Sequence, residues 1–278
     1  IIADTEIDYK NCIRTFNSDI KQFIDFLKSF KYDNLKILWD LGISRDSYKE
    51  EYKPITDRMI AFLDRMAKEY HPQNCVIKKD VGALYKQEFA NCPNEQCYCS
   101  PYTLLRLLAD MVEGMPEKLL YLDVDVMFQH DIRLLYDIDV SNVEYAAAND
   151  HYGKYLIHPR YINAGVLLFN MKKVRETGLL KKARELIKTK KLVFADQSAI
   201  IRSTTKKKLI AQKFNDQKFL HKHTVVRHFS KRLFYLPYPH TDNIKQWHID
   251  KMHKVFGYHQ FDDILDEYCL KKKELEEE

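Results

Sequence analysis

The sequence predicts an α/β fold in which a mixed, mostly parallel sheet is flanked by helices. Short apolar runs that fit strands alternate along the chain with amphipathic segments that fit helices, an order typical of layered α/β domains. The 278 residues are 45% apolar and 13% aromatic, which is enough to bury a substantial core. The length favours one large domain with a smaller appendage.

The first third of the chain supplies the first strands and helices. Its helices are indicated by apolar residues that recur at i, i+3, i+4 and i+7, as in Ile20, Phe23, Ile24 and Leu27. In chain order, we expect a strand at 1–4, a helix that begins behind Asn17 or Ser18, a strand at 35–39, a helix at 46–67 and a strand at 76–78.

The middle of the chain continues the alternation. Ser100 is a good N-cap with Pro101 at the first helical position, and Gly114 follows the end of the segment. We expect a helix at 101–112, strands at 118–123, 145–148 and 164–170, and helices at 179–190 and 196–203 on either side of residues 192–194. Beyond about Phe214 the chain is rich in His, Tyr and Pro. We therefore divide it into a main domain, 1–214, and an irregular extension, 215–278, that ends in a helix.

Composition excludes several classes of ligand site. The chain has seven glycines, and the closest two, Gly153 and Gly165, are too far apart for a G-x-G-x-x-G motif or a P-loop. The net charge of +5 is spread over short lysine clusters without the dense basic stripe of a nucleic-acid-binding protein, so we expect no nucleic-acid partner. A phosphorylated ligand must therefore be held without a glycine-rich loop.

Cysteine usage and hydropathy bear on the cellular compartment. The spacing of Cys92, Cys97 and Cys99 lacks the paired C-x2-C halves of a zinc site, which favours reduced thiols over a structural metal. No apolar run is long enough to span a membrane, and the chain begins at Ile1 without Met, which leaves a trimmed leader open. We expect a cytoplasmic protein, with peripheral association at the inner face of the membrane as the alternative.

The most informative motif is an acidic pair in an apolar run. Asp123 and Asp125 interrupt the run LLYLDVDVMF, which is typical of a strand buried on both faces. Residues two apart on a strand share a face, so we expect the two carboxylates to converge. No Lys or Arg within the strand neutralises them, which favours a hard divalent cation over two structural, capping aspartates. The end of a buried strand is also where open α/β sheets place their ligands.

Three blocks of the sequence resemble glycosyltransferase family 8. YLDVDVMF is followed by YINAGVLLFNM and FADQSAI in the family's order and approximate spacing, and the resemblance extends from Ile1 to about Trp247. Within the family, the chain is similar to bacterial sugar transferases of the lipopolysaccharide galactosyltransferase type. The resemblance implies the GT-A fold, a Rossmann-like fold of nucleotide-diphospho-sugar transferases. Residues 1–214 would bind the nucleotide sugar, and the extension would complete the metal and diphosphate site.

The family's activity follows as an expectation. The resemblance implies a retaining enzyme of bacterial glycan biosynthesis that moves a hexose or related sugar from a UDP-sugar to a hydroxyl of a glycan, lipid-linked or protein-linked acceptor. It implies Mn²⁺ as the cofactor, with Mg²⁺ as a substitute. The segment between Asp150 and Asn163 is shorter than the acceptor-side loop of relatives, so the resemblance does not identify the acceptor.

Site residues are carried over position by position. The resemblance implies that Asp123, Asp125 and His228 bind the metal, and that Gln197, Asp196 and Asp150 lie at the reacting sugar. It implies a further set of donor-binding residues: Ala3, Asp4, Arg106, Val124, Asn163, Ala164, Gly165, and Lys245 or Lys231. Lys245 is favoured over Lys231 because it precedes Trp247 in a K-x-W remnant, although the family's Pro is missing. Taken alone, Asp196 indicates a helix N-cap, and Arg106 indicates a partly buried Arg with an anionic partner.

The expected mechanism is a front-face displacement, because Gln197 is an amide and no carboxylate is placed as the nucleophile. Gln197 and Asp150 would stabilise the charge on the sugar. Two other functions stay open from the sequence. Paired aspartates also serve nucleotidyltransferases and phosphohydrolases, and the basic clusters with the aromatic segment KRLFYLPYPH fit a non-enzymatic module that binds RNA or another anionic ligand.

Overall fold

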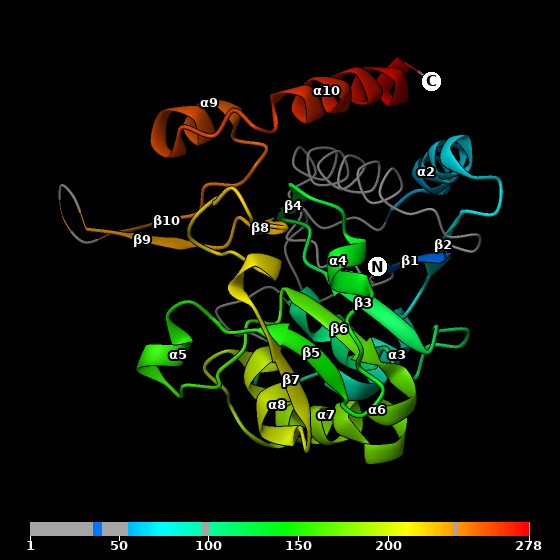
Figure 1. Cartoon of the computed structure of the whole chain (residues 1–278). Helices are drawn as coiled ribbons and strands as arrows, with labels where there is room; N and C mark the ends of the chain where they lie inside the picture. Colours follow the sequence, from blue (N-terminus) through cyan, green and yellow to red (C-terminus); the bar gives the residue numbers. More distant parts are fainter. Residues whose placement is uncertain (1–35, 41–54, 96–100, 236–237, 239, 278) are drawn as a thin grey trace.

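The computed structural model describes residues 36–40, 55–95, 101–235, 238 and 240–277 (Figure 1). The elements predicted at 1–4 and behind Asn17 or Ser18 lie outside the described residues, as do Ala3, Asp4, Ser100, Cys97 and Cys99. The described chain has the predicted α/β fold, with a mixed sheet covered by helices. No described helix has the length and apolar character needed to cross a bilayer.

The central sheet has the strand order β3-β6-β5-β7. Its strands are β3 (Lys118–Leu122), β5 (Tyr145–Ala148), β6 (Val166–Asn170) and β7 (Lys207–Ile210). β6 runs antiparallel to both β3 and β5, whereas β5 and β7 are parallel. Nearly every side chain of β3, β5 and β6 is buried, so these strands carry no alternation of apolar and polar residues.

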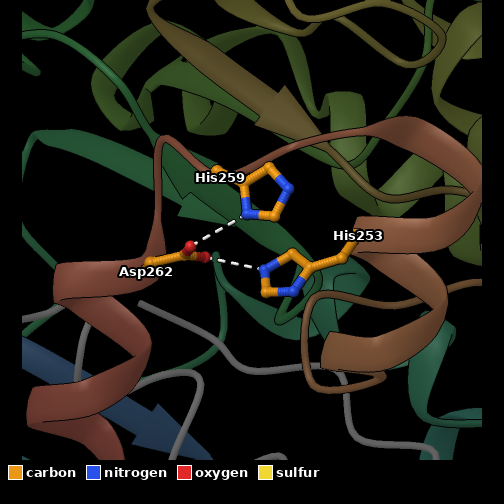
Figure 2. A group of neighbouring side chains, drawn as sticks. All are labelled: His253, His259 and Asp262. Carbon is orange, nitrogen blue, oxygen red and sulfur yellow. Dashed lines mark hydrogen bonds and ion pairs between the residues drawn. The ribbon is translucent and has the colours of Figure 1, made fainter.

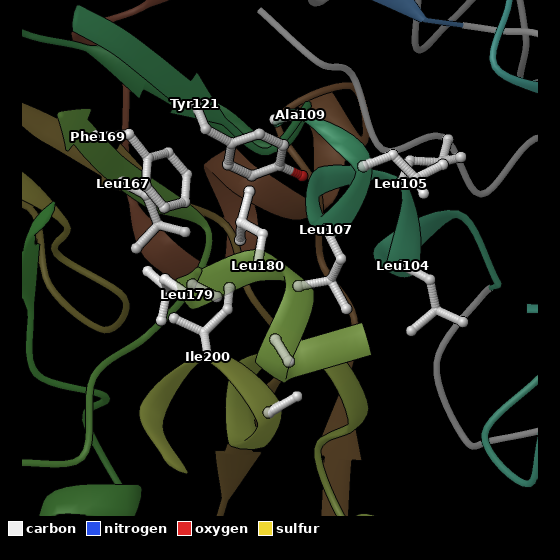
Figure 3. Close-up of a cluster of buried hydrophobic side chains, with 14 of the residues drawn as sticks. Leu104, Leu105, Leu107, Ala109, Tyr121, Leu167, Phe169, Leu179, Leu180 and Ile200 are labelled. Atoms are coloured by element: carbon white, nitrogen blue, oxygen red, sulfur yellow. The ribbon is translucent and has the colours of Figure 1, made fainter. Parts of the chain in front are cut away.

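Helices cover one face of this sheet, and Figure 1 shows them below it. They are α3 (Gly82–Phe89), α6 (Met171–Thr177), α7 (Leu179–Thr189) and α8 (Ala195–Ser203). The helix predicted at 101–112 is instead a 3₁₀ helix, η1 (Pro101–Leu108). The Nε–H of Arg106 donates to the carbonyl of Thr103 (3.1 Å), which is an acceptor that an α-helix would use for its own backbone. The leucines of η1 pack against α7, α8 and the sheet (Figure 3).

The N-terminal part of the described chain forms a separate, two-stranded parallel sheet. β1 (Lys36–Asp40) pairs with β2 (Cys75–Lys79), and α2 (Asp57–Tyr70) connects them. α2 begins behind Thr56, whose hydroxyl accepts the Met59 N–H (3.2 Å). The described part of the predicted helix at 46–67 is therefore helical from Asp57 onward and continues to Tyr70.

The C-terminal extension has regular structure that the sequence did not indicate. In the extension, β8 (Val226–His228) pairs antiparallel with β4 (Val126–Phe128) of the main domain, and β9 (Arg232–Phe234) pairs with β10 (His240–Asp242). The chain then forms α9 (Ile249–Lys251), the π-helix η3 (Met252–Phe256) and the predicted last helix, α10 (Asp262–Glu277). α10 lies near α2 (Figure 1), and the Arg58 guanidinium donates to the carbonyl of Leu275. Three short elements complete the described chain: α4 (Arg133–Tyr136), α5 (Gly153–Leu156) and η2 (Gln212–Phe214).

Candidate active site

The two aspartates of the apolar run lie in the turn between β3 and β4. The sequence predicted that Asp123 and Asp125 converge because alternate residues of one strand share a face. That reason is wrong, because β3 ends directly before the pair and β4 begins directly after it. Neighbouring segments fix the turn: the Asp123 N–H donates to the Gly165 carbonyl (2.7 Å), and the Phe229 N–H donates to the Asp125 carbonyl (2.7 Å). The carboxylates converge because other parts of the chain hold the bend.

His228 completes a compact group of three metal-ligand types. It is the last residue of β8, and the strand register pairs His228 with Val126 of β4. Its Nε2 lies 3.1 Å from Asp125 Oδ1 and 3.8 Å from Asp123 Oδ2. One nitrogen or oxygen from each of the three residues lies within 4.8 Å of the others. The structure thus brings together the three residues that the sequence proposed as metal ligands.

A chain of hydrogen bonds determines which nitrogen of His228 carries the proton. A backbone N–H can only donate, so the Asn163 atom 3.0 Å from the Gly165 nitrogen must be the oxygen Oδ1. This oxygen also faces the Asn215 side chain, which must present its NH2 group to it (3.0 Å). Asn215 therefore turns its Oδ1 toward His228 Nδ1 (3.0 Å), and Nδ1 must carry the hydrogen that it donates there. In the neutral imidazole, Nε2 is left with a lone pair that faces the two aspartates.

These residues fit a divalent cation. The Nε2 lone pair and the oxygens of two carboxylates are all acceptors, and they repel one another unless a proton or a cation lies among them. Two carboxylates and one imidazole form a donor set suited to Mn²⁺ and related divalent ions. The hydrogen bond from Nδ1 is the outer contact that usually orients a metal-binding histidine. Gly165 keeps this space open, because a Cβ at that position would lie 2.6 Å from Asp123 Oδ2.

Two cations from distant segments also neutralise the aspartates, contrary to the expectation based on the strand alone. An Arg106 NH2 group donates to Asp123 Oδ1 (3.0 Å), and the Arg106 Nε lies 3.1 Å from Asp196 Oδ2. The Lys245 Nζ pairs with Asp125 and donates to the carbonyl of Phe229 (2.9 Å). A metal is therefore supported by the convergence of acceptors at His228, and an absence of basic residues no longer supports it.

Burial and charge act in opposite directions on two carboxyl groups. Burial by itself would raise the pKa of Asp125, but the Lys245 ammonium, aided by His228 when its Nε2 carries a proton, outweighs it and holds that pKa far below the usual range. Asp196 is buried beside a single guanidinium, and its burial raises the pKa above the ordinary value even though Arg106 opposes the shift. Asp125 is therefore held as an anion, as a metal ligand must be.

The turn 163–165 connects this group to the other predicted sugar-site residues. The Ala164 N–H donates to Gln197 Oε1 (2.9 Å), and its carbonyl accepts from Arg106 (2.6 Å). The Asn163 Nδ2 donates to Asp150 Oδ2 (3.1 Å). The other oxygen of Asp150, Oδ1, accepts hydrogen bonds from the N–H groups of Tyr152 (3.1 Å) and Gly153 (2.7 Å). The predicted residues of this region therefore form one connected hydrogen-bonded group.

Several predicted residues have specific placements. Lys245 lies at Asp125, whereas Lys231 is an exposed residue before β9. The backbone carbonyl of Val124 accepts from the Gln246 amide (2.9 Å). Asp196 does not cap α8, since the helix begins at Ala195 behind Phe194. Asp196 is instead buried inside the first turn of α8. Ala3 and Asp4 lie outside the described residues.

Sequence reasoning missed three residues that hold the site. Asn215 is the first residue of the extension that was expected to be irregular, and Gln246 is the unassigned position of the K-x-W remnant. Tyr121 donates its hydroxyl to Asp123 Oδ1 (2.7 Å), and the Arg106 guanidinium carbon lies 4.3 Å from the centre of its ring. The i, i+2 spacing of Tyr121 and Asp123 at the end of an apolar run could have indicated this contact. No local signal would have found Asn215, because its partners are distant in sequence.

Comparisons with known proteins identify the family of the chain. Residues 3–232 match the family model described as glycosyl transferase family 8. A Haemophilus influenzae protein to which a glycosyltransferase activity is provisionally assigned is 32% identical over 109 residues, which cover 35% of this chain and 33% of that protein. The match thus spans about a third of that relative's length.

Solved structures share the fold at low identity. The galactosyltransferase LgtC, in complex with donor and acceptor sugar analogues, superposes with a TM-score of 0.60 at 17% identity, covering 95% of this chain and 98% of LgtC. The glycosyltransferase GlyE of Streptococcus pneumoniae TIGR4 gives a TM-score of 0.61 at 17% identity, covering 97% of this chain and 62% of GlyE. At such identities these likenesses establish the fold alone, and that fold is GT-A.

Proposed function

The chain belongs to glycosyl transferase family 8, and from this premise we propose that it is a glycosyltransferase that moves a hexose or related sugar from a UDP-sugar to a hydroxyl of a glycan, lipid-linked or protein-linked acceptor. The observation that supports a metal-dependent reaction is the lone pair of His228 Nε2 facing the carboxylates of Asp123 and Asp125. These three residues would hold Mn²⁺, or Mg²⁺ in its place.

When bound, the cation supplies positive charge that stabilises the negative charge developing on the diphosphate as UDP leaves. Lys245 is the chain's own cation beside this position, and we assign it a charge-assisted hydrogen bond to the diphosphate. Arg106 bonds to Asp123, Asp196 and the Ala164 carbonyl. These bonds support a role in orienting Asp123, in place of the direct donor contact that the resemblance implies.

The sugar would lie against the turn 163–165, where Gly165 lets the ligand approach the backbone closely. The carboxylates of Asp150 and Asp196 are engaged by N–H donors and by Arg106, respectively. This supports a front-face displacement with retention, in which neither group attacks the sugar and the nearby oxygens of Gln197 and Asp150 stabilise its positive charge. A lipid-linked acceptor would bring the enzyme to the inner face of the membrane.

The test is a screen of UDP-sugars for Mn²⁺-dependent binding and turnover. We expect one UDP-sugar to be hydrolysed or transferred with retention, as measured by anomer-resolved NMR. Asp125→Asn should abolish binding of UDP with Mn²⁺, whereas Asp139→Asn, which removes an exposed carboxylate, should preserve it. If nucleoside triphosphates stabilise the protein and no UDP-sugar does, a nucleotidyltransferase or phosphohydrolase replaces this proposal. An inverted product would remove the front-face mechanism alone.

A further inference from the structure

A second group of metal-ligand side chains lies in the C-terminal extension, away from the aspartate turn. His253 belongs to the π-helix η3, His259 to the following loop, and Asp262 is the first residue of α10. His253 Nε2 lies 2.7 Å from one oxygen of Asp262, and His259 Nδ1 lies 3.1 Å from the other (Figure 2). Candidate ligand atoms of the three residues lie within 4.8 Å of one another.

The donor chemistry of this group differs from that of the candidate active site. Two imidazoles and one carboxylate favour Zn²⁺ and neighbouring transition metals, whereas two carboxylates and one imidazole suit Mn²⁺ or Mg²⁺ better. The two rings lie close together, with centroids 4.2 Å apart and planes at 28°, so the two imidazoles can present nitrogen ligands to the same ion as the Asp262 carboxylate.

Backbone hydrogen bonds order the segment that carries the three ligands. Gly257, at φ +65°, ends η3, and its N–H donates to the His253 carbonyl (2.9 Å). The Asp262 N–H donates to the His259 carbonyl (3.2 Å). π-helical turns are rare and occur often at functional sites, and His253 lies in one. The ligands therefore converge on a prearranged loop.

Apolar contacts connect this loop to the aspartate turn. Met252 precedes His253, Phe261 precedes Asp262, and both are buried in one cluster with Met127 and Phe229. Phe229 follows His228, and its carbonyl accepts from Lys245. An ion at the loop would thus brace the part of the extension that supplies His228 and Lys245.

We propose that His253, His259 and Asp262 bind one Zn²⁺ ion, which fixes the turn between η3 and α10. This site is independent of the sugar-transfer reaction, because none of its ligands belongs to the candidate active site. Its role is structural: it ties the end of one helix to the start of the next, over a buried apolar cluster that supports the metal-ligating face of the fold.

The test uses the full chain and the probes Zn²⁺ and Co²⁺. In the Asp125→Asn background, which disables the first group, calorimetry should still show one equivalent of Zn²⁺. Co²⁺ should give the intense visible absorption of a low-coordinate imidazole site. His259 is exposed, so His259→Ala should leave the fold intact. Because it removes a direct ligand, it should weaken Zn²⁺ affinity by more than the ~10–100-fold that the loss of a hydrogen-bond partner of a ligand costs. Asp262→Asn should do the same.

His223→Ala is the matched control, since His223 is exposed and also stacks on a second histidine, with centroids 5.5 Å apart. It should bind Zn²⁺ and Co²⁺ as the parent does. Zn²⁺ should also raise the Tm of the parent and not that of His259→Ala. Equal Zn²⁺ affinity in His259→Ala and the parent would overturn the proposal, as would a parent that binds no Zn²⁺ in the Asp125→Asn background. The three side chains would then form a hydrogen-bonded cluster only.

Discussion

The substitution Asn215→Leu tests whether the hydrogen bond from Asn215 to His228 Nδ1 sets the tautomer of His228 and thereby its ability to bind a metal. Leucine keeps the branched shape of asparagine at the fully buried position of Asn215, although its two methyl groups are larger than the amide, a packing cost that the control below shares. It removes the acceptor of the His228 Nδ1–H and the donor to Asn163 Oδ1. Asn163 Oδ1 keeps the Gly165 N–H as a partner. The substitution therefore leaves one buried donor, the Nδ1–H of His228, without its acceptor.

Two magnitudes follow from this geometry. An orphaned buried donor costs about 1–3 kcal/mol of stability. His228 can avoid that cost by moving its proton to Nε2, which lies 3.1 Å from Asp125 Oδ1 and would donate to it. In that tautomer the metal-binding lone pair is lost. Removing the outer partner of a metal-binding histidine lowers affinity by ~10–100-fold, and we expect Mn²⁺ affinity to fall within that range.

The assay measures Mn²⁺ affinity by electron paramagnetic resonance and the histidine tautomer by ¹⁵N NMR. The matched control is Asn94→Leu, which removes another fully buried amide whose side chain bonds to the Ile187 and Lys190 carbonyls, far from the site. Asn94→Leu should lose stability and keep Mn²⁺ affinity, whereas Asn215→Leu should lose both and shift the His228 proton to Nε2. Unchanged Mn²⁺ affinity and an unchanged tautomer in Asn215→Leu would refute the reasoning.

Three further predictions test other parts of the site and fold. Gly165→Ala should weaken binding of UDP with Mn²⁺ by at least tenfold in calorimetry, because the new Cβ would lie 2.6 Å from Asp123 Oδ2; unaltered affinity would contradict the close approach. Arg106→Met should lower the free energy of unfolding by about 3–5 kcal/mol in urea titrations, since it leaves the carboxylates of Asp123 and Asp196 near each other without their cation; a loss below about 1 kcal/mol would show that other groups neutralise them. Burial alone would raise the pKa of Glu144, but the hydroxyl and N–H donors before β7 outweigh it and hold that pKa below its ordinary 4.5. The charged form therefore contributes stability that is complete above pH 4.5 and is lost as the pH falls further, so Glu144→Gln should flatten the acid side of the stability-pH curve, and an unchanged slope would exclude this role.

Local patterns predicted β3, β5 and β6 of the central sheet, but they missed β7 and did not predict the strand directions. The strand at 145–148 was predicted with the bounds that the structure shows, and β3 and β6 differ from prediction only at their ends. Whether β6 runs parallel or antiparallel to its neighbours could not be predicted, because a strand buried on both faces has an apolar run in either case. The helix at 101–112 was predicted from Ser100 as the N-cap, Pro101 at the first position and Gly114 after the end, but the Arg106 side chain takes a backbone carbonyl there and the segment is 3₁₀.

The candidate site was predictable where short motifs carry the chemistry, and not where distant contacts complete it. The acidic pair stands out in the sequence, the family resemblance added the turn 163–165 and His228, and the structure brings them together. The partner of Asp125, Lys245, is 120 positions away, and its placement depends on how the extension packs. No periodicity or cap encodes such a contact.

Gly165 shows why the shortage of glycines noted in the sequence does not prevent a tight ligand site. Its missing side chain leaves the space beside Asp123 and His228, and its N–H fixes the orientation of the Asn163 amide. That amide orients Asn215, and Asn215 fixes the proton on His228 Nδ1. One glycine therefore determines both the volume of the site and the direction of a lone pair three hydrogen bonds away. A glycine-rich loop binds phosphate with several backbone N–H groups. Here one backbone N–H acts through side chains, and the Lys245 ammonium, together with a cation held by Asp123, Asp125 and His228, would supply the remaining attraction for an anionic ligand.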